Sequence, residues 1–238
     1  MKTYYQDKWV TIYHGDCREV LPQLDVKVDL VVTDPPYNVI GLDNFVDVAT
    51  YRKWAMVWIK ECFNLMNYRG NFIISGRPPV LAYLIVDICD FGKVFREMIT
   101  WHKTDGITPV SNYHSTNYEQ FAVFSDWVNG VFNYIPVEAK TDNYSPMRNM
   151  GCIWSLPKLS RQHREGKEHP EQKPCKIIER FIETYSNNEA MALDPFLGSG
   201  TTCFCAKKLN RYSIGIEIEE KYCEIAARRC CQEVMELS

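Results

Sequence analysis

A short segment at the end of an apolar run carries residues suited to chemistry on an amino group. The run is Val28 to Thr33, and Asp34-Pro35-Pro36-Tyr37 follows it directly. Proline has no N–H, so carbonyl and carboxylate acceptors dominate this segment, while Tyr37 adds a flat aromatic face. These groups together offer hydrogen-bond acceptors for an amine and a stacking surface for a base. Asp-Pro-Pro by itself is also typical of a rigid turn.

A second candidate site is a glycine-rich turn, Asp194-Pro195-Phe196-Leu197-Gly198-Ser199-Gly200-Thr201-Thr202, which follows one predicted strand and opens a predicted helix. Glu217 ends the next predicted strand. Glycines in such a turn allow a ligand to approach closely, and an acid in this position can bind ribose hydroxyls. The dinucleotide pattern GxGxxG and the GK[ST] of a P-loop are both absent. The pattern therefore predicts a nucleoside ligand other than an intact dinucleotide, with a plain strand–helix turn as the alternative.

The elements that must position these segments alternate between strands and helices. Hydrophobic patterning predicts strands at 28–33, 71–75, 94–101, 120–124, 190–193 and 212–216, and helices at 51–65, 78–90, 174–187, 201–209 and 219–235. The strand patterns are apolar rather than alternating, which is typical of parallel strands buried on both faces. We therefore expect an α/β fold in one domain, 1–238, in which the irregular segment 132–168 is an inserted region.

Composition narrows the class of protein. The chain has 238 residues with 46% hydrophobic and 24% charged residues, so it is expected to be globular rather than disordered or fibrous. Its longest apolar run, Val80 to Val86, is too short to span a membrane. Residues 1–16 lack the apolar core of a secretory signal, so a cytoplasmic location is expected. The ten cysteines include no CxxC pair and are interpreted as buried, reduced thiols rather than disulfides or metal ligands.

Four motifs in combination resemble the amino-methylating DNA methyltransferases, which use S-adenosylmethionine (SAM). Two are the segments described above. His169-Pro170-Glu171-Gln172-Lys173-Pro174 resembles a third motif, and His14-Gly15-Asp16-Cys17 resembles a fourth. The catalytic motif precedes the SAM motif, which is similar to the β group of that family. The resemblance implies a Rossmann-like SAM-dependent methyltransferase fold, with a seven-stranded, mostly parallel sheet and a circularly permuted motif order.

The resemblance also implies roles for individual residues. Asp34 and Pro35 would accept hydrogen bonds from the target amine, and Tyr37, beside Pro36, would stack on a flipped base. Glu217 would bind the ribose of SAM and Asp16 its adenine, while His169 and Lys173 would border its carboxylate. The full set of expected cofactor-binding residues is Asp16, Cys17, His169, Lys173, Asp194, Phe196, Leu197, Gly198, Ser199, Gly200, Thr201, Glu217 and Ile218.

The family's target-recognition segment would correspond to residues 132–168. A net charge of −3 argues mildly against a nucleic-acid partner, but residues 140–180 hold nine basic and five acidic residues. The candidate DNA contacts are Lys140, Arg148, Lys158, Arg161, Arg164 and Lys167, with a solvated loop as the alternative. The partners that fit the resemblance are double-stranded DNA, a second copy of the chain and a cognate restriction endonuclease; no membrane partner is expected.

The residue types suit direct methylation of an amine. Two acceptors on its hydrogens favour an available nitrogen lone pair, and no covalent enzyme intermediate is needed. Methylation of cytosine carbon 5 would need a nucleophilic cysteine in Pro-Cys-Gln, whereas this chain has only Pro174-Cys175-Lys176. Within the family, Asp in the first position is commoner among adenine N6 enzymes, so that activity is expected. The alternatives are a cytosine N4 enzyme and an inactive SAM- or DNA-binding subunit.

Overall fold

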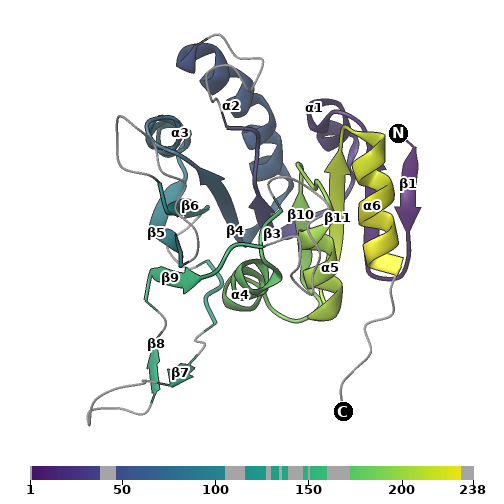
Figure 1. Ribbon diagram of the computed structural model, residues 1–238. Coiled ribbons are helices and arrows are strands. Elements are labelled where there is room, and N and C mark those ends of the chain that lie inside the picture. The colour runs from purple at the N-terminus through teal and green to yellow at the C-terminus, as the bar shows by residue number, and fades with distance from the viewer. Residues whose placement is uncertain are drawn as a thin grey trace.

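The computed structural model describes residues 2–37, 47–104, 116–126, 130–133, 136–138, 147–149, 151–159 and 172–231. Strands and helices alternate along most of this length (Figure 1). The strands are β1 (Thr3–Gln6), β2 (Val10–His14), β3 (Val28–Thr33), β4 (Met66–Gly76), β5 (Val94–Lys103), β6 (Tyr118–Ser125), β7 (Pro136–Glu138), β8 (Met147–Asn149), β9 (Ile153–Leu156), β10 (Met191–Asp194) and β11 (Tyr212–Glu217). The helices are α1 (Cys17–Val20), the single 3₁₀ turn η1 (Leu21–Gln23), α2 (Val48–Leu65), α3 (Val80–Asp90), α4 (Cys175–Tyr185), α5 (Thr201–Lys208) and α6 (Glu220–Cys231).

One mixed sheet of nine strands, in the order β1-β2-β11-β10-β3-β4-β6-β5-β9, forms the centre of the molecule. The five adjacent strands from β2 to β4 are mutually parallel, whereas β6 is antiparallel to both of its neighbours. The expected α/β fold is confirmed. The seven strands expected from the resemblance are the inner ones, and β1 and β9 extend the sheet at its two edges.

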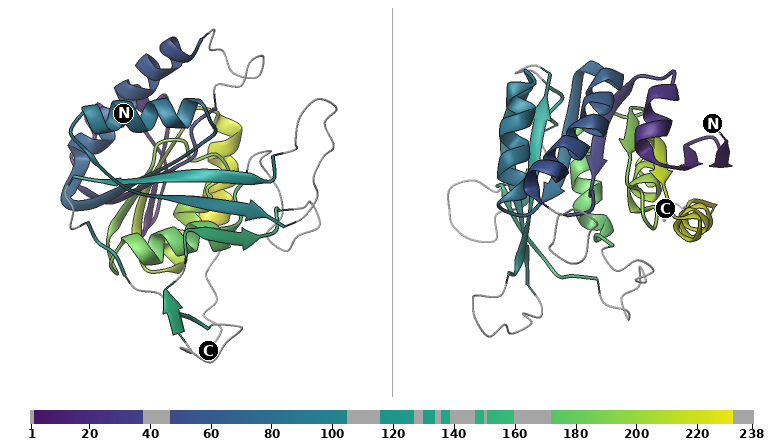
Figure 2. Two further views of the ribbon diagram at one scale, coloured as in Figure 1. Left: turned by 90° about the vertical axis from the view of Figure 1, so that its left-hand side faces the viewer. Right: turned by 90° about the horizontal axis from the view of Figure 1, so that it is seen from above.

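Helices cover both faces of the sheet, with α1, α2 and α3 on one and α4, α5 and α6 on the other (Figures 1 and 2). The strand sequences show why both faces need cover. In β4, Phe72 and Ile74 point into the core under α2 and α3, and Ile73 points into the core under α4. Adjacent side chains of a strand point to opposite faces, so a continuous apolar run produces a sheet that is buried on both sides.

The order of the strands creates a switch point between β3 and β10. From β3 the chain crosses through α2 to β4 on one side, and from β10 it crosses through α5 to β11 on the other. At such a point the two crossovers diverge and leave a crevice beyond the carboxyl ends of the strands, where α/β folds bind their ligands. Asp34 follows β3 and Asp194 ends β10, so both motifs meet at this crevice. The half with the glycine turn comes second in the chain, which confirms the permuted motif order.

The segment 132–168, expected as an inserted region, includes a strand of the main sheet. β9 pairs in parallel with β5 at the sheet edge, and Trp154 on β9 packs into the core against Phe181 of α4. β7 and β8 pair with each other in a separate two-stranded sheet. Within the described ranges, no helix is long and apolar enough to cross a bilayer.

Candidate functional site

A cavity of about 710 Å³ opens at the switch point, within the roughly 300–1,000 Å³ typical of small-molecule sites. It brings together residues of all four motifs, which lie far apart in the sequence. All four residues of the Asp34–Tyr37 segment line it. Of the expected cofactor-binding residues, those that line it are Asp16, Cys17, Lys173, Asp194, Phe196, Leu197, Gly198, Ser199, Thr201, Glu217 and Ile218.

The glycine turn is held in shape by Asp194 at the end of β10. Its carboxylate accepts hydrogen bonds from the backbone N–H of Phe196 at 3.0 Å and from the hydroxyl of Thr202 at 2.6 Å. Burial raises the pKa of Asp194 to about 7. Asp194 lines the cavity, and its two hydrogen bonds connect the glycine turn to the start of α5.

The two glycines of this turn have different functions. Both have left-handed backbone conformations, with φ of 53° at Gly198 and 85° at Gly200, which other residues rarely adopt. Gly198 lines the cavity, whereas Gly200 does not. A Cβ at Gly200 would lie 2.7 Å from the Cβ of Ala226 on α6. The structure therefore places Gly200 against α6 rather than in the wall of the cavity, and its expected contact with the ligand stays a prediction.

Glu217 at the end of β11 is suited to accept hydrogen bonds from a ligand. Its Oε2 accepts a hydrogen bond from the N–H of Gly198 at 2.7 Å, and its Oε1 accepts one from the N–H of Glu219 at 2.8 Å. Burial raises its pKa above the ordinary value. A carboxylate oxygen can accept two hydrogen bonds, so the Glu217 carboxylate retains capacity for a hydroxyl after these backbone contacts.

The far wall of the cavity is built from the end of β2 and from α1 and α2. Asp16 caps α1 by accepting a hydrogen bond from the N–H of Arg18 at 2.9 Å, and its pKa is lowered, chiefly by the side chain of Arg18. Burial raises the pKa of Cys17 to about 12, so it is not a nucleophile at neutral pH. Phe196 lies on Trp54 and Trp58, with ring centroids 5.7 and 4.9 Å apart, which makes one side of the cavity aromatic.

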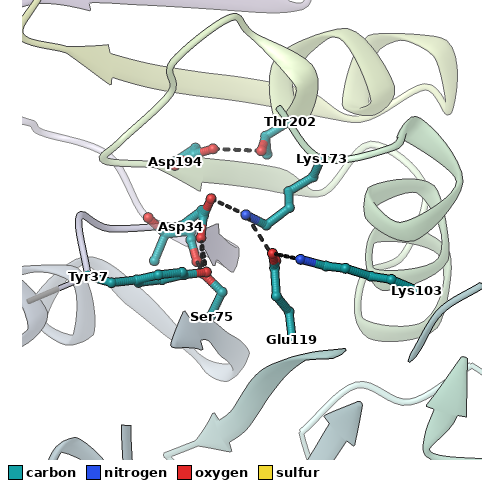
Figure 3. Close-up of polar contacts among 9 residues, drawn as sticks. Asp34, Tyr37, Ser75, Lys103, Glu119, Lys173, Asp194 and Thr202 are labelled. Atoms are coloured by element: carbon teal, nitrogen blue, oxygen red, sulfur yellow. Dashed lines mark hydrogen bonds and ion pairs between the residues drawn. The ribbon is translucent and has the colours of Figure 1, made fainter. Parts of the chain in front are cut away.

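Asp34 is the most heavily hydrogen-bonded residue of its motif. Its Oδ1 accepts from the hydroxyl of Tyr37 at 2.5 Å and from the hydroxyl of Ser75 on β4, and its Oδ2 accepts from the ammonium of Lys173 (Figure 3). The side chain remains 24% exposed to the cavity. Burial works against the charged form, but the nearby Lys173 ammonium and the hydroxyls of Ser75 and Tyr37 together outweigh it and hold the pKa of Asp34 below its ordinary value.

The double proline is fixed by a contact from α2. The hydroxyl of the buried Tyr51 donates a hydrogen bond to the carbonyl of Pro36 at 2.9 Å. Cations border the ring of Tyr37, with Arg77 5.6 Å and Lys173 5.8 Å from its centroid. The segment is therefore a pre-formed corner of the cavity, consistent with the predicted pair of acceptor and stacking groups.

Lys173 lies closer to the catalytic motif than the resemblance implied. Its ammonium lies between two carboxylates, those of Asp34 and Glu119, with Oε2 of Glu119 at 3.1 Å. Lys103 contacts the other oxygen of Glu119 (Figure 3). The third motif contributes a second contact, because Oε1 of the neighbouring Gln172 accepts a hydrogen bond from the hydroxyl of Ser199 at 3.2 Å.

Several expected site residues lie outside the described residues: His169, Lys140, Arg161, Arg164 and Lys167. Arg148 falls in β8, where only the backbone is described, and Lys158 follows β9 with a partly exposed side chain.

Sequence patterns missed four residues that shape the site. Ser75 and Glu119 reach Asp34 and Lys173 from two inner strands, and Arg77 lies at the cavity rim. The buried Arg229 of α6 donates to the carbonyl of Ser199 at 2.8 Å and so supports the glycine turn from behind. None of them stands in a recognisable motif. Only the position of Ser75 and Arg77, around the carboxyl end of a predicted strand, offered a signal.

Two relatives resemble the chain over most of its length. The type II methyltransferase M.ScaI of Streptomyces caespitosus is 30% identical over 264 residues, which cover 99% of this chain and 86% of that protein. The DNA adenine methyltransferase YhdJ of Escherichia coli strain K12 is 28% identical to the chain, and the match covers 95% of this chain and 84% of that protein.

Two solved structures have the same fold. The M1.HpyAVI–SAM complex superposes with a TM-score of 0.71 at 26% identity, covering 94% of this chain and all of that one. The cytosine-N4-specific PvuII DNA methyltransferase superposes with a TM-score of 0.81 at 18% identity, covering 99% of this chain and 91% of that one. A family model of DNA methylases matches residues 28–228. This match agrees with the meeting of the Asp34–Tyr37 segment and the glycine turn at one cavity. The chain therefore belongs to the family of N6 and N4 DNA amino-methyltransferases.

Proposed function

We propose that the chain methylates the N6 amine of adenine in a specific sequence of double-stranded DNA. The observation that carries this proposal is the Asp34 carboxylate, which is ionised, held by three donors and still open to the cavity. An anionic acceptor at this place suits an amino group, which must give up a proton when it is methylated.

S-adenosylmethionine supplies the methyl group as an electrophilic sulfonium methyl. The residues that surround the cavity fit it. The carboxylate of Glu217, backed by two N–H groups, would accept from the ribose hydroxyls, and Asp16 would contact the adenine ring. Phe196 and the positive φ of Gly198 would border the methionine end. The M1.HpyAVI structure at 26% identity, solved with SAM, supports this assignment.

The chain's own groups act on the target amine. Asp34 Oδ2 and the Pro35 carbonyl would accept its two N–H bonds, and Tyr37 would stack on the flipped base. Extruding a base costs a few kcal/mol, so contacts to the DNA backbone must offset that cost. We assign these contacts to 132–168, including Lys158, and add Arg77, an exposed cation at the cavity rim.

Adenine is favoured over cytosine by Asp34 itself and by the relative YhdJ, whose name specifies adenine. The structural similarity to PvuII methyltransferase, a cytosine N4 enzyme, keeps cytosine as the second candidate. The type II relatives support a role beside a restriction endonuclease.

Nucleoside mass spectrometry of DNA incubated with the purified protein and SAM tests this function. N6-methyladenine is the expected product. If N4-methylcytosine forms instead, the assignment of the site stands and the target base is cytosine rather than adenine. If SAM binds and no methylated base forms on any DNA, the chain acts as an inactive subunit or on another substrate, and the proposal is wrong.

A further inference from the structure

Four charges of alternating sign run from the cavity into the sheet. They are Asp34 after β3, Lys173 ahead of α4, Glu119 on β6 and Lys103 on β5 (Figure 3). The side chains of Lys173 and Glu119 are only 7% and 3% exposed. Buried charges are tolerated when each is paired, and the alternation leaves this row with no net charge. Such an arrangement is costly to build and calls for a function.

The hydrogen bonds at Asp34 show which oxygen is open to substrate. Its Oδ1 accepts from two hydroxyls, those of Tyr37 and Ser75, while its Oδ2 accepts from Lys173. Each carboxylate oxygen has two lone pairs. Among the described contacts, the remaining lone pair of Asp34 therefore belongs to Oδ2, the oxygen that Lys173 holds.

We propose that Lys173 is a positioning residue that keeps Asp34 ionised and presents its Oδ2 to the target amine. This inference rests on the proposed role of Asp34 as amine acceptor. Once methylated, the target nitrogen carries one proton too many. Its N–H bond breaks with the electron pair remaining on nitrogen, an O–H bond forms at Oδ2, and the proton passes to solvent after the product leaves.

Glu119 has the supporting function of holding Lys173 in place. A lone ammonium beside Asp34 would bring a positive charge next to the cationic methyl donor. Glu119 balances that charge, and Lys103 in turn neutralises the other oxygen of Glu119. The four groups together, Asp34 included, carry no net charge.

The test replaces the ammonium and follows pH. The charged or titratable groups that face Asp34 are Lys173, Tyr37, Glu119 and Asp194. Asp34 works when ionised, so activity is lost as pH falls through its pKa. Without Lys173, only the hydroxyls of Ser75 and Tyr37 oppose the effect of burial, so the pKa of Asp34 rises. In Lys173→Met we expect kcat to fall about tenfold or more from pH 8 to pH 5.5, where the wild type changes less than about twofold.

A second readout separates this role from the one that the family resemblance implies. If Lys173 bound the carboxylate of SAM, Lys173→Met would weaken SAM binding in calorimetry and leave the pH profile of kcat unmoved, which would overturn the proposal. An unchanged profile with unchanged SAM affinity would overturn it too. We expect SAM affinity to stay within about threefold of the wild type.

Controls keep the result interpretable. Lys173→Arg retains the charge and should restore the wild-type profile, and Lys208→Met removes an exposed lysine that pairs with Glu179 away from the cavity. If Lys173→Met does not fold, the pH profile of kcat in the wild type still tests the proposal. A loss of kcat at low pH that is centred above about pH 5 contradicts an Asp34 held ionised by Lys173. If the wild type methylates no DNA, the proposed function itself fails.

Discussion

At the residue scale, Asp34 is partly buried and yet has a lowered pKa. Burial alone would favour the neutral acid. The adjacent Lys173 ammonium and the hydroxyls of Ser75 and Tyr37 stabilise the charged form instead. A carboxylate in this state accepts hydrogen bonds at neutral pH without first losing a proton, which suits it to gripping an amine.

We expect Asp34→Ala to abolish turnover and leave SAM binding largely intact. The substitution removes the acceptor at the cavity but no group on the side of the cavity formed by Glu217 and the glycine turn. A loss of about 10²–10⁴-fold in kcat is the usual scale for a missing acid–base group. Single-turnover methylation, with SAM affinity from calorimetry, measures both effects. Substantial residual turnover would contradict the amine-acceptor role.

Asp194 links the site to the stability of the fold through pH. Burial raises its pKa to about 7, while in the unfolded chain an aspartate titrates near 3.9. The folded state thus keeps a proton that the unfolded chain releases, so the stability from this group is lost as pH rises from about 4 to 7. In Asp194→Asn that decline is absent. We expect Tm to drop less between about pH 5 and pH 8 in the variant than in the wild type; equal drops would contradict the raised pKa.

At the element scale, the turn between β10 and α5 shapes the ligand site on one side and packs against α6 on the other. Gly198 faces the cavity and Gly200 faces Ala226. Arg229 of α6 hydrogen-bonds to Ser199 between them. Two glycines that look alike in the sequence are therefore required for different reasons.

Substitutions at the two glycines should separate those reasons. We expect Gly198→Val to weaken SAM binding by about tenfold or more, because a side chain is placed in the cavity. Gly200→Ala should destabilise the fold through its contact with α6. Gly92→Ala is the control, because Gly92 has a similar φ of 87° and nothing within 4 Å of a new Cβ. Gly200→Ala should cost about 1–3 kcal/mol more than this control in chemical unfolding; equal costs would leave backbone strain as the whole effect.

Boundaries of elements were predicted less well than their existence. The turn expected at Arg69-Gly70 lies inside β4, which begins at Met66 and shifts its pairing with β3 between Val28 and Leu30. β1 and β2 were not foreseen, because both strands are short and polar residues interrupt them, as Thr11 and His14 do in Val10–His14. The pairing of β2 with β11, and of β1 with β2, stabilises strands that the local pattern alone does not indicate.

At the scale of the whole molecule, β9 joins the segment 132–168 to the sheet. Trp154 is 4% exposed, packs 4.8 Å from the ring of Phe181, and donates its indole N–H to the carbonyl of Gly151. The start of this segment is tied down as well, because the side-chain amide of Asn133 donates to backbone carbonyls at the end of α4. The region assigned to DNA recognition is therefore attached to the core at both of its described ends.

Trp154→Ala should loosen that attachment. We expect a loss of about 3–5 kcal/mol in the free energy of unfolding, the usual cost of truncating a buried aromatic residue. The neighbouring Ile153 is 68% exposed, and Ile153→Ala should change stability by no more than about 0.5 kcal/mol. Urea unfolding followed by fluorescence and circular dichroism measures both. A small effect at Trp154 would mean that β9 contributes little to the sheet.

The sequence by itself determined the α/β class, the Asp34–Tyr37 and glycine-turn segments, and the permuted order in which these two motifs occur. These rest on local patterns, namely apolar runs, proline and glycine turns and an acid at a strand end, which can be read within a few residues of one another. Only the tertiary structure decided which side chains meet. Lys173 lies 139 residues from Asp34 in the chain, and Glu119 reaches Lys173 from a strand that carries no motif. Such contacts depend on the order in which strands pair in the sheet, and that order is set by packing across the whole core rather than by the residues of any one segment.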